Sequence, residues 1–156
     1  MVQKSKNFAG SKGRRGEQEI NRLLQPVIDS IYSEFSLPAP QLYRNKNQSH
    51  KGGYDIDGIS WLAIEVKFQE TFNLSKWWEQ TLSQASEDQV PVLIYKKAYV
   101  KWRVRMFGYL DCGDTRVKAI VDISIDDFLT FLYYRLKDDL TKSILEEDDF
   151  DLDLPT

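Results

Sequence analysis

The segment GGYDIDGISWLAIEVKFQE, residues 52–70, carries charged side chains where a buried strand is expected. Successive side chains of a β-strand point to opposite faces. A strand is predicted near the end of this segment. One of its faces is apolar and is expected to face the core: Leu62, Ile64, Val66 and Phe68. The other face brings Glu65 and Lys67 together, about 7 Å apart along the strand. This strand is therefore predicted to contribute one face to the hydrophobic core and the other face to a functional site.

Two further acids lie just upstream, where Asp55 and Asp57 share one face of a preceding strand. A turn near residues 58–60 would pair the two strands and bring an Asp beside Glu65. Two close carboxylates repel each other unless a cation lies between them. Hard oxygen ligands of this kind suit Mg²⁺. The segment therefore predicts a magnesium site.

A helix is predicted from about Lys12 to Phe35, because its apolar residues recur at helical spacing. At 100° per residue, Glu17 lies nearly in line with the apolar Leu24 and Ile28, so it is expected to face inward. A carboxylate on an inward face needs a partner. The metal region and Lys67 are the two candidates.

The remaining segments predict an α/β fold. Strands are expected over residues 41–45, 54–59, 60–68, 90–97, 100–110 and 116–123. Ser75 is the expected N-cap of a helix over 76–88, and Ser124, with Asp127 in capping-box position, opens a last helix. The order is helix, three strands, helix, three strands, helix. It predicts one domain with a mixed sheet flanked by helices.

Composition and charge limit the function. The 156 residues are 42% hydrophobic, which suits one domain with a real core. The sole cysteine, Cys112, allows no internal disulfide and fits a cytoplasmic protein. No apolar run approaches the ~20 residues of a membrane span. There is also no phosphate-binding P-loop, and the single histidine, His50, excludes a two-histidine metal site.

Charge is unevenly distributed although the net charge is only −3. A flexible basic arm is expected over residues 1–11, a folded domain over 12–145 and a disordered acidic tail over 146–156. A basic arm on a near-neutral body suggests a polyanionic partner, and a merely solvated terminus is the alternative. The tail is expected to aid solubility; competition with DNA or docking of a protein partner are alternatives.

A second basic feature lies in residues 95–106, which contain five Lys and Arg residues and no acid. On a strand, Lys101, Arg103 and Arg105 would share one face. Such a ridge could follow the phosphates of a nucleic acid. An ordinary solvent-facing strand is an equally good interpretation.

The order Asp55, then Glu65-Val66-Lys67, resembles the signature of the PD-(D/E)XK nuclease superfamily. More narrowly, residues 10–107 resemble archaeal-type Holliday junction resolvases and their phage-encoded relatives. The segments on which this resemblance rests are KGRRGEQEINRLL (12–24), YRN (43–45), GGYDIDGISWLAIEVK (52–67), WWEQTLSQA (77–85) and VPVLIYKK (90–97). Tyr54 replaces the family's proline. The pattern of Asp, an apolar residue and then Gly two further on favours Asp55 over Asp57.

The resemblance implies a restriction-endonuclease-like fold and Mg²⁺-dependent hydrolysis of DNA, with Mn²⁺ able to substitute. Asp55, Glu65 and the Val66 carbonyl would hold the metal, and Glu17 would help directly or through water. Lys67 would steady the attacking water or the developing negative charge. Gln84, with Gln80 as the alternative, would support the site.

The resemblance also implies a DNA surface and a homodimer. A loop flanking the site would reach the DNA backbone, together with the basic arm and ridge. The expected DNA-binding residues are Arg14, Arg15, Arg44, Lys46, Ser49, Lys51, Lys101, Arg103 and Arg105. The leading hypothesis is a resolvase that makes paired nicks in four-way junctions as a symmetric dimer. The alternatives are a restriction-like or degradative phage endonuclease, and a DNA-binding module without activity.

Overall fold

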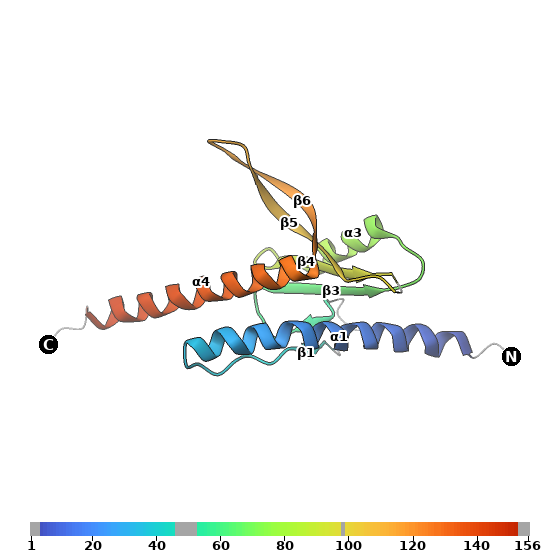
Figure 1. The fold of residues 1–156 in the computed structure, drawn as a ribbon, viewed down its shortest axis with the longest axis horizontal. Helices are drawn as coiled ribbons and strands as arrows, with labels where there is room; N and C mark the ends of the chain where they lie inside the picture. Colours follow the sequence, from blue (N-terminus) through green and yellow to red (C-terminus); the bar gives the residue numbers. More distant parts are fainter. Residues whose placement is uncertain (1–3, 46–52, 98, 153–156) are drawn as a thin grey trace.

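The computed structural model describes residues 4–45, 53–97 and 99–152, with side chains between residues 12 and 149 of those ranges. These parts form three helices and six strands in the predicted order (Figure 1). The elements are α1 (Lys4–Glu34), β1 (Tyr43–Arg44), β2 (Ile56–Asp57), β3 (Leu62–Phe68), α3 (Leu74–Gln84), β4 (Val90–Lys96), β5 (Arg103–Asp111), β6 (Arg116–Ser124) and α4 (Ile125–Leu152). The predicted α/β class with one mixed sheet is confirmed.

The six strands form one sheet in the order β1-β2-β3-β4-β5-β6. Only β3 and β4 run parallel, and the other neighbours are antiparallel. Parallel neighbours need a crossover connection, and α3 supplies it. Both α1 and α3 contact β3, and they cover its opposite faces.

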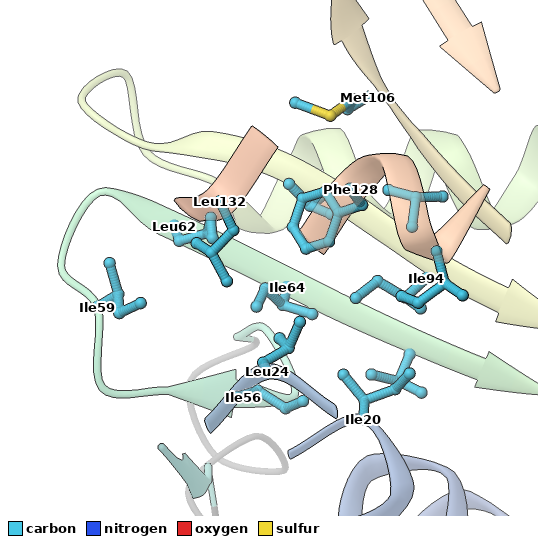
Figure 2. Packing of buried hydrophobic residues seen from close by; sticks show 14 of the residues in the cluster. Ile20, Leu24, Ile56, Ile59, Leu62, Ile64, Ile94, Met106, Phe128 and Leu132 are labelled. Atoms are coloured by element: carbon cyan, nitrogen blue, oxygen red, sulfur yellow. The ribbon is translucent and has the colours of Figure 1, made fainter. Parts of the chain in front are cut away.

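Helices α1 and α4 lie side by side on one face of the sheet and build the main core (Figure 1). Figure 2 shows Ile20 and Leu24 of α1 packed with Ile64 of β3, Ile94 of β4 and Phe128 of α4. All five are almost completely buried. The apolar face predicted for β3 is therefore confirmed as core.

Helix α3 covers the opposite face with a smaller cluster. Trp77 and Trp78 pack there against Leu93 and Tyr95 of β4. The helix begins one residue before the predicted N-cap Ser75. Asn73 is the N-cap instead, and its side-chain oxygen accepts a hydrogen bond from the Lys76 amide at 3.3 Å. Ser75 therefore lies inside the first turn.

Both terminal helices are longer than predicted. Helix α1 begins at Lys4, so most of the expected flexible arm over residues 1–11 is helical. Helix α4 continues to Leu152 and includes most of the expected disordered tail over 146–156. No glycine or proline interrupts the chain between Ser124 and Pro155, so nothing in the backbone chemistry stops α4 earlier. The predicted start of α4 is confirmed, since the Asp127 amide donates to the Ser124 hydroxyl at 3.0 Å.

None of the helices in the described part of the chain is long and apolar enough to cross a membrane.

Candidate active site

The candidate site lies where β2 and β3 separate. Their ladder in the described chain is registered only at Ile56 and Ile64, beside a hydrogen bond of 2.8 Å from the Asp55 amide to the Ile64 carbonyl. Strand β3 then continues to Phe68. At this point the Val66 amide donates to Asp55 Oδ2 at 2.7 Å. The Asp55 carboxylate thus takes the place of a neighbouring strand and is fixed at the edge of β3.

The two aspartates of this segment have different surroundings. Asp55 is buried, whereas Asp57 is half-buried and lies beside β1. The Asp57 carboxylate accepts hydrogen bonds from the Tyr43 hydroxyl at 3.0 Å and the Gly58 amide at 2.7 Å. Gly58 has φ +129°, and a Cβ there would lie 2.6 Å from the Gln41 carbonyl oxygen, so the turn requires glycine. Asp55 is therefore the aspartate that contacts β3.

Glu65 projects from the α3 side of β3 and is only 2% exposed. Its Oε1 atom accepts a hydrogen bond from Gln80 Nε2 at 3.0 Å and lies 2.9 Å from Lys67 Nζ. Its other oxygen, Oε2, is buried and has no hydrogen-bond partner among the residues that the structure describes. The predicted pairing of Glu65 and Lys67 on one face is confirmed. It leaves one carboxylate oxygen of Glu65 unsatisfied.

Glu17 faces inward from α1, as predicted, and is 5% exposed. The preceding Gly16 allows this position, because a Cβ there would approach the Phe68 Cβ to 3.2 Å. Glu17 forms an ion pair with Arg44 of β1. The suggestion that Lys67 neutralises Glu17 was therefore wrong, since the Lys67 ammonium pairs with Glu65.

Asp55 influences the protonation of the two buried glutamates. The pKa of Glu65 rises from 4.5 to about 7, chiefly because of burial and then because of the nearby Asp55 charge, with a smaller contribution from Glu17. Lys67 opposes this rise. Burial and the Asp55 charge also raise the pKa of Glu17, against the effect of Arg44. Burial and the Asp55 charge thus together outweigh the effect of the neighbouring cations on both glutamates.

A cavity of about 480 Å³ opens at this end of β3. Its lining includes Glu17, Asp55, Val66 and Lys67. Lys12 of α1 lines it as well and forms an ion pair of 2.6 Å with Glu70, which joins α1 to the segment after β3. Glu17, Asp55 and Lys67 therefore adjoin a space that can admit a ligand, and Glu65 lies behind this lining, paired with Lys67.

The described residues contain no group of three His, Cys, Asp or Glu side chains arranged to hold a metal ion. In this conformation Glu17 is engaged by Arg44, and Glu65 Oε1 by Lys67 and Gln80. The donors nevertheless suit a divalent cation. Asp55 and Glu65 offer buried, mutually repelling carboxylates, and Glu65 Oε2 is a buried acceptor without a donor. Glu17 would join them only by leaving Arg44 or by acting through water.

The glutamine that reaches the site is Gln80. Its amide nitrogen donates to Glu65. Gln84, the predicted supporting residue, lies one turn further on at the end of α3, and its buried Oε1 has no hydrogen-bond partner in the described part of the chain. Residues four apart share one face of a helix, so sequence spacing did not distinguish the two glutamines.

The predicted DNA-binding residues divide into groups. Four of them are exposed: Arg14, Arg15, Lys101 and Arg103. Arg44 instead forms an ion pair with Glu17. Lys46, Ser49 and Lys51 lie outside the described residues.

The predicted basic ridge on β5 requires correction. Lys101 precedes the strand, which begins at Arg103. Arg105 is engaged by the Asp122 carboxylate of β6 through two nitrogens, the shorter distance being 2.8 Å from Nη2. The sequence could not reveal this pairing, because it depends on the register between β5 and β6. Lys101 and Arg103 remain the exposed cations of the ridge.

Comparison with known proteins gave no match to any family model, curated protein or solved structure.

Proposed function

We propose that this protein is a metal-dependent DNA endonuclease of the PD-(D/E)XK type. The observation that carries the proposal is the grouping of Glu17, Asp55 and Glu65, from three separate segments, in which burial and then the nearby Asp55 charge raise the pKa of both glutamates. Lys67 is paired with one of these glutamates. The grouping adjoins a cavity at an interrupted sheet edge.

The competing interpretation is a structural network of ion pairs. Burial of ionised groups costs free energy, which even a well-placed partner often fails to recover. Here Glu65 also has a buried oxygen without any partner. A network that served only stability would gain by replacing Glu65 with an apolar residue. Strongly perturbed carboxylates beside a cavity favour a functional site.

In the proposed mechanism Asp55 and Glu65 would hold Mg²⁺, for which Mn²⁺ could substitute, with the Val66 carbonyl as a third donor. The ion would polarise the phosphodiester and lower the pKa of an attacking water. The Val66 amide orients the Asp55 carboxylate. Gln80 and Lys67 both bind Oε1 of Glu65, which holds that side chain in place and leaves Oε2 without a hydrogen-bond partner among the described residues.

Lys67 has the second role in this mechanism. Its ammonium is a compact positive charge on a flexible stem, suited to steadying the attacking water or the charge that develops on the phosphate. Glu17 would act through water while Arg44 holds it.

We propose branched DNA, including four-way junctions, as the substrate, on the basis of the resolvase resemblance. The exposed cations Arg14, Arg15, Lys101 and Arg103 are available for phosphate contacts. A C₂ homodimer would bring two sites to one junction and produce paired nicks. A restriction-like or degradative endonuclease with the same site would cut duplex DNA equally well, and an inactive binding module would cut neither.

The deciding experiment compares cleavage of a labelled four-way junction with cleavage of a duplex of the same sequence, with and without Mg²⁺. Paired symmetric nicks confined to the junction would support the resolvase. Equal cutting of the duplex would keep the nuclease and reject junction selectivity. Tight binding without cutting in Mg²⁺ or Mn²⁺ would reject the nuclease and support the DNA-binding module.

The two aspartates supply a matched pair of variants for this assay. Asp55→Asn should abolish cleavage and retain binding, and its Oδ1 can still accept the Val66 hydrogen bond. Asp57→Asn makes the same chemical change two residues away, beside β1, and should cut normally. Loss of cleavage in Asp57→Asn alone would show that the wrong aspartate has been assigned.

A further inference from the structure

A second cavity, of about 410 Å³, lies at the end of β4 on the side covered by α3. Phe72, Tyr95 and Val100 line it together with the cations Lys96, Lys97, Lys101 and Arg103. Phe72 directly follows Thr71, which lines the candidate active-site cavity. The two cavities therefore adjoin the same short segment after β3.

Phe72 is the aromatic ring that this cavity presents to solvent, with 48% of the residue exposed. It is held by two near-perpendicular ring contacts, with centroids 5.2 Å from Trp77 and 5.6 Å from Tyr95. Both partners are buried, and the Tyr95 hydroxyl donates to Asp122 at 2.8 Å. Phe72 is thus a half-exposed ring on a rigid aromatic support.

The rim of the cavity is basic. Lys97, Lys101 and Arg103 are exposed, and no acidic side chain is among the described residues that line the cavity. The nearby Asp122 is engaged by Arg105 and Tyr95. Lys96 pairs with Glu19, and Arg103 donates to the Asp122 carbonyl at 3.2 Å while remaining exposed. An aromatic surface beside the exposed cations Lys97, Lys101 and Arg103 is complementary to a ligand with a flat ring and a negative charge.

We propose that this cavity binds an unpaired nucleotide of the DNA substrate. The base would stack on Phe72, and the flanking phosphates would lie against Lys97, Lys101 and Arg103. The proposal rests on the proposed nuclease function and adds a basis for preferring DNA with a single-stranded flap or a frayed branch point over continuous duplex DNA, because such a branch offers an unpaired base. The basic rim favours this occupant over the apolar side chain of a protein partner.

The test uses equilibrium binding by fluorescence anisotropy in EDTA, where no cleavage occurs. The probe is a duplex with a short single-stranded flap, compared with the same flap made abasic. For the wild-type protein, removal of the bases should weaken binding by about 5- to 100-fold, the usual contribution of base–aromatic stacking. Phe72→Leu should weaken binding of the intact flap similarly and should no longer distinguish it from the abasic flap. Phe72→Trp, which keeps an aromatic surface, should retain the distinction.

Two results would overturn the proposal: unchanged flap binding by Phe72→Leu, or a Phe72→Leu variant that still distinguishes intact from abasic flaps. The second result would place the base elsewhere on the protein. Unchanged thermal unfolding of Phe72→Leu and unchanged affinity for a flap-free duplex would show that the fold is intact. Failure of the nuclease proposal would appear separately, as an absence of Mg²⁺-dependent cutting by a protein that still binds flaps through Phe72.

Discussion

The two faces of β3 are equally buried and have opposite roles. Ile64, on the α1 side, and Glu65, on the α3 side, are both 2% exposed. Burial of Ile64 stabilises the fold through apolar packing. Burial of Glu65 removes a carboxylate from water, and one of its oxygens gains no partner. The degree of burial therefore does not separate core from site, whereas the chemistry of the buried group does.

The largest effect that follows from this comparison concerns activity. Glu65→Gln keeps the shape of the side chain and an oxygen that can accept from Gln80, but it removes the charge proposed to hold the metal. Several kcal/mol of transition-state stabilisation would be lost, so cleavage should fall about a thousandfold or more. Single-turnover cleavage measures this. Glu79→Gln, the same change at an exposed position of α3, should remain within about twofold of wild type. Equal activity of both variants would remove Glu65 from the site.

A substitution on the opposite face of β3 should change the stability of the fold. Ile64→Ala leaves a cavity in the main core (Figure 2) and should lower the free energy of unfolding by about 2–5 kcal/mol. Urea denaturation followed by tryptophan fluorescence measures this. Leu110→Ala is the matched truncation on the β5–β6 hairpin, where 53% of the residue is exposed, and should cost less than about 1 kcal/mol. Equal losses would mean that Ile64 contributes no more packing than an exposed leucine.

A smaller effect should appear as a dependence of stability on pH in EDTA. The pKa of Glu65 rises from 4.5 to about 7 on folding, so between these values the folded protein retains a proton that the unfolded chain has released. The free energy of unfolding should therefore fall as the pH rises through this range and level off above it. A tenfold change in an acid dissociation constant corresponds to about 1.36 kcal/mol, so the contribution of Glu65 is at most on the order of 3 kcal/mol.

Glu65→Gln should remove this contribution, so the variant should gain stability relative to wild type as the pH rises from 4.5 to about 7. Parallel curves for the two proteins would show that Glu65 titrates as it does in water. The experiment tests the cost of the buried charge without relying on any activity.

Local periodicity was sufficient to predict much of this arrangement. Alternation along β3 assigned Ile64 and Glu65 to different faces, and helical spacing turned Glu17 inward. The partners of these residues were not predictable, because Arg44 follows Glu17 by 27 positions and meets it only through tertiary packing. The choice between Gln80 and Gln84 failed for a related reason. The two share a helix face and differ by one turn along its axis. Only the position of α3 along the sheet decides which of them reaches Glu65.

The smallest predicted effect concerns the N-terminus of α3, the helix that carries Gln80 to Glu65. Asn73 caps this helix through the Lys76 amide, so Asn73→Ala should lower the free energy of unfolding by about 1 kcal/mol. Ser75→Ala, at the position that the sequence favoured as the cap, should change it by less than about 0.5 kcal/mol, because Ser75 is exposed within the first turn. Urea denaturation of both variants measures the difference. A larger loss from Ser75→Ala would show that Ser75, and not Asn73, caps α3. Loss of the Asn73 cap should also weaken the hydrogen bond from Gln80 to Glu65, so the α3 face of β3 depends on this cap in a way that the α1 face does not.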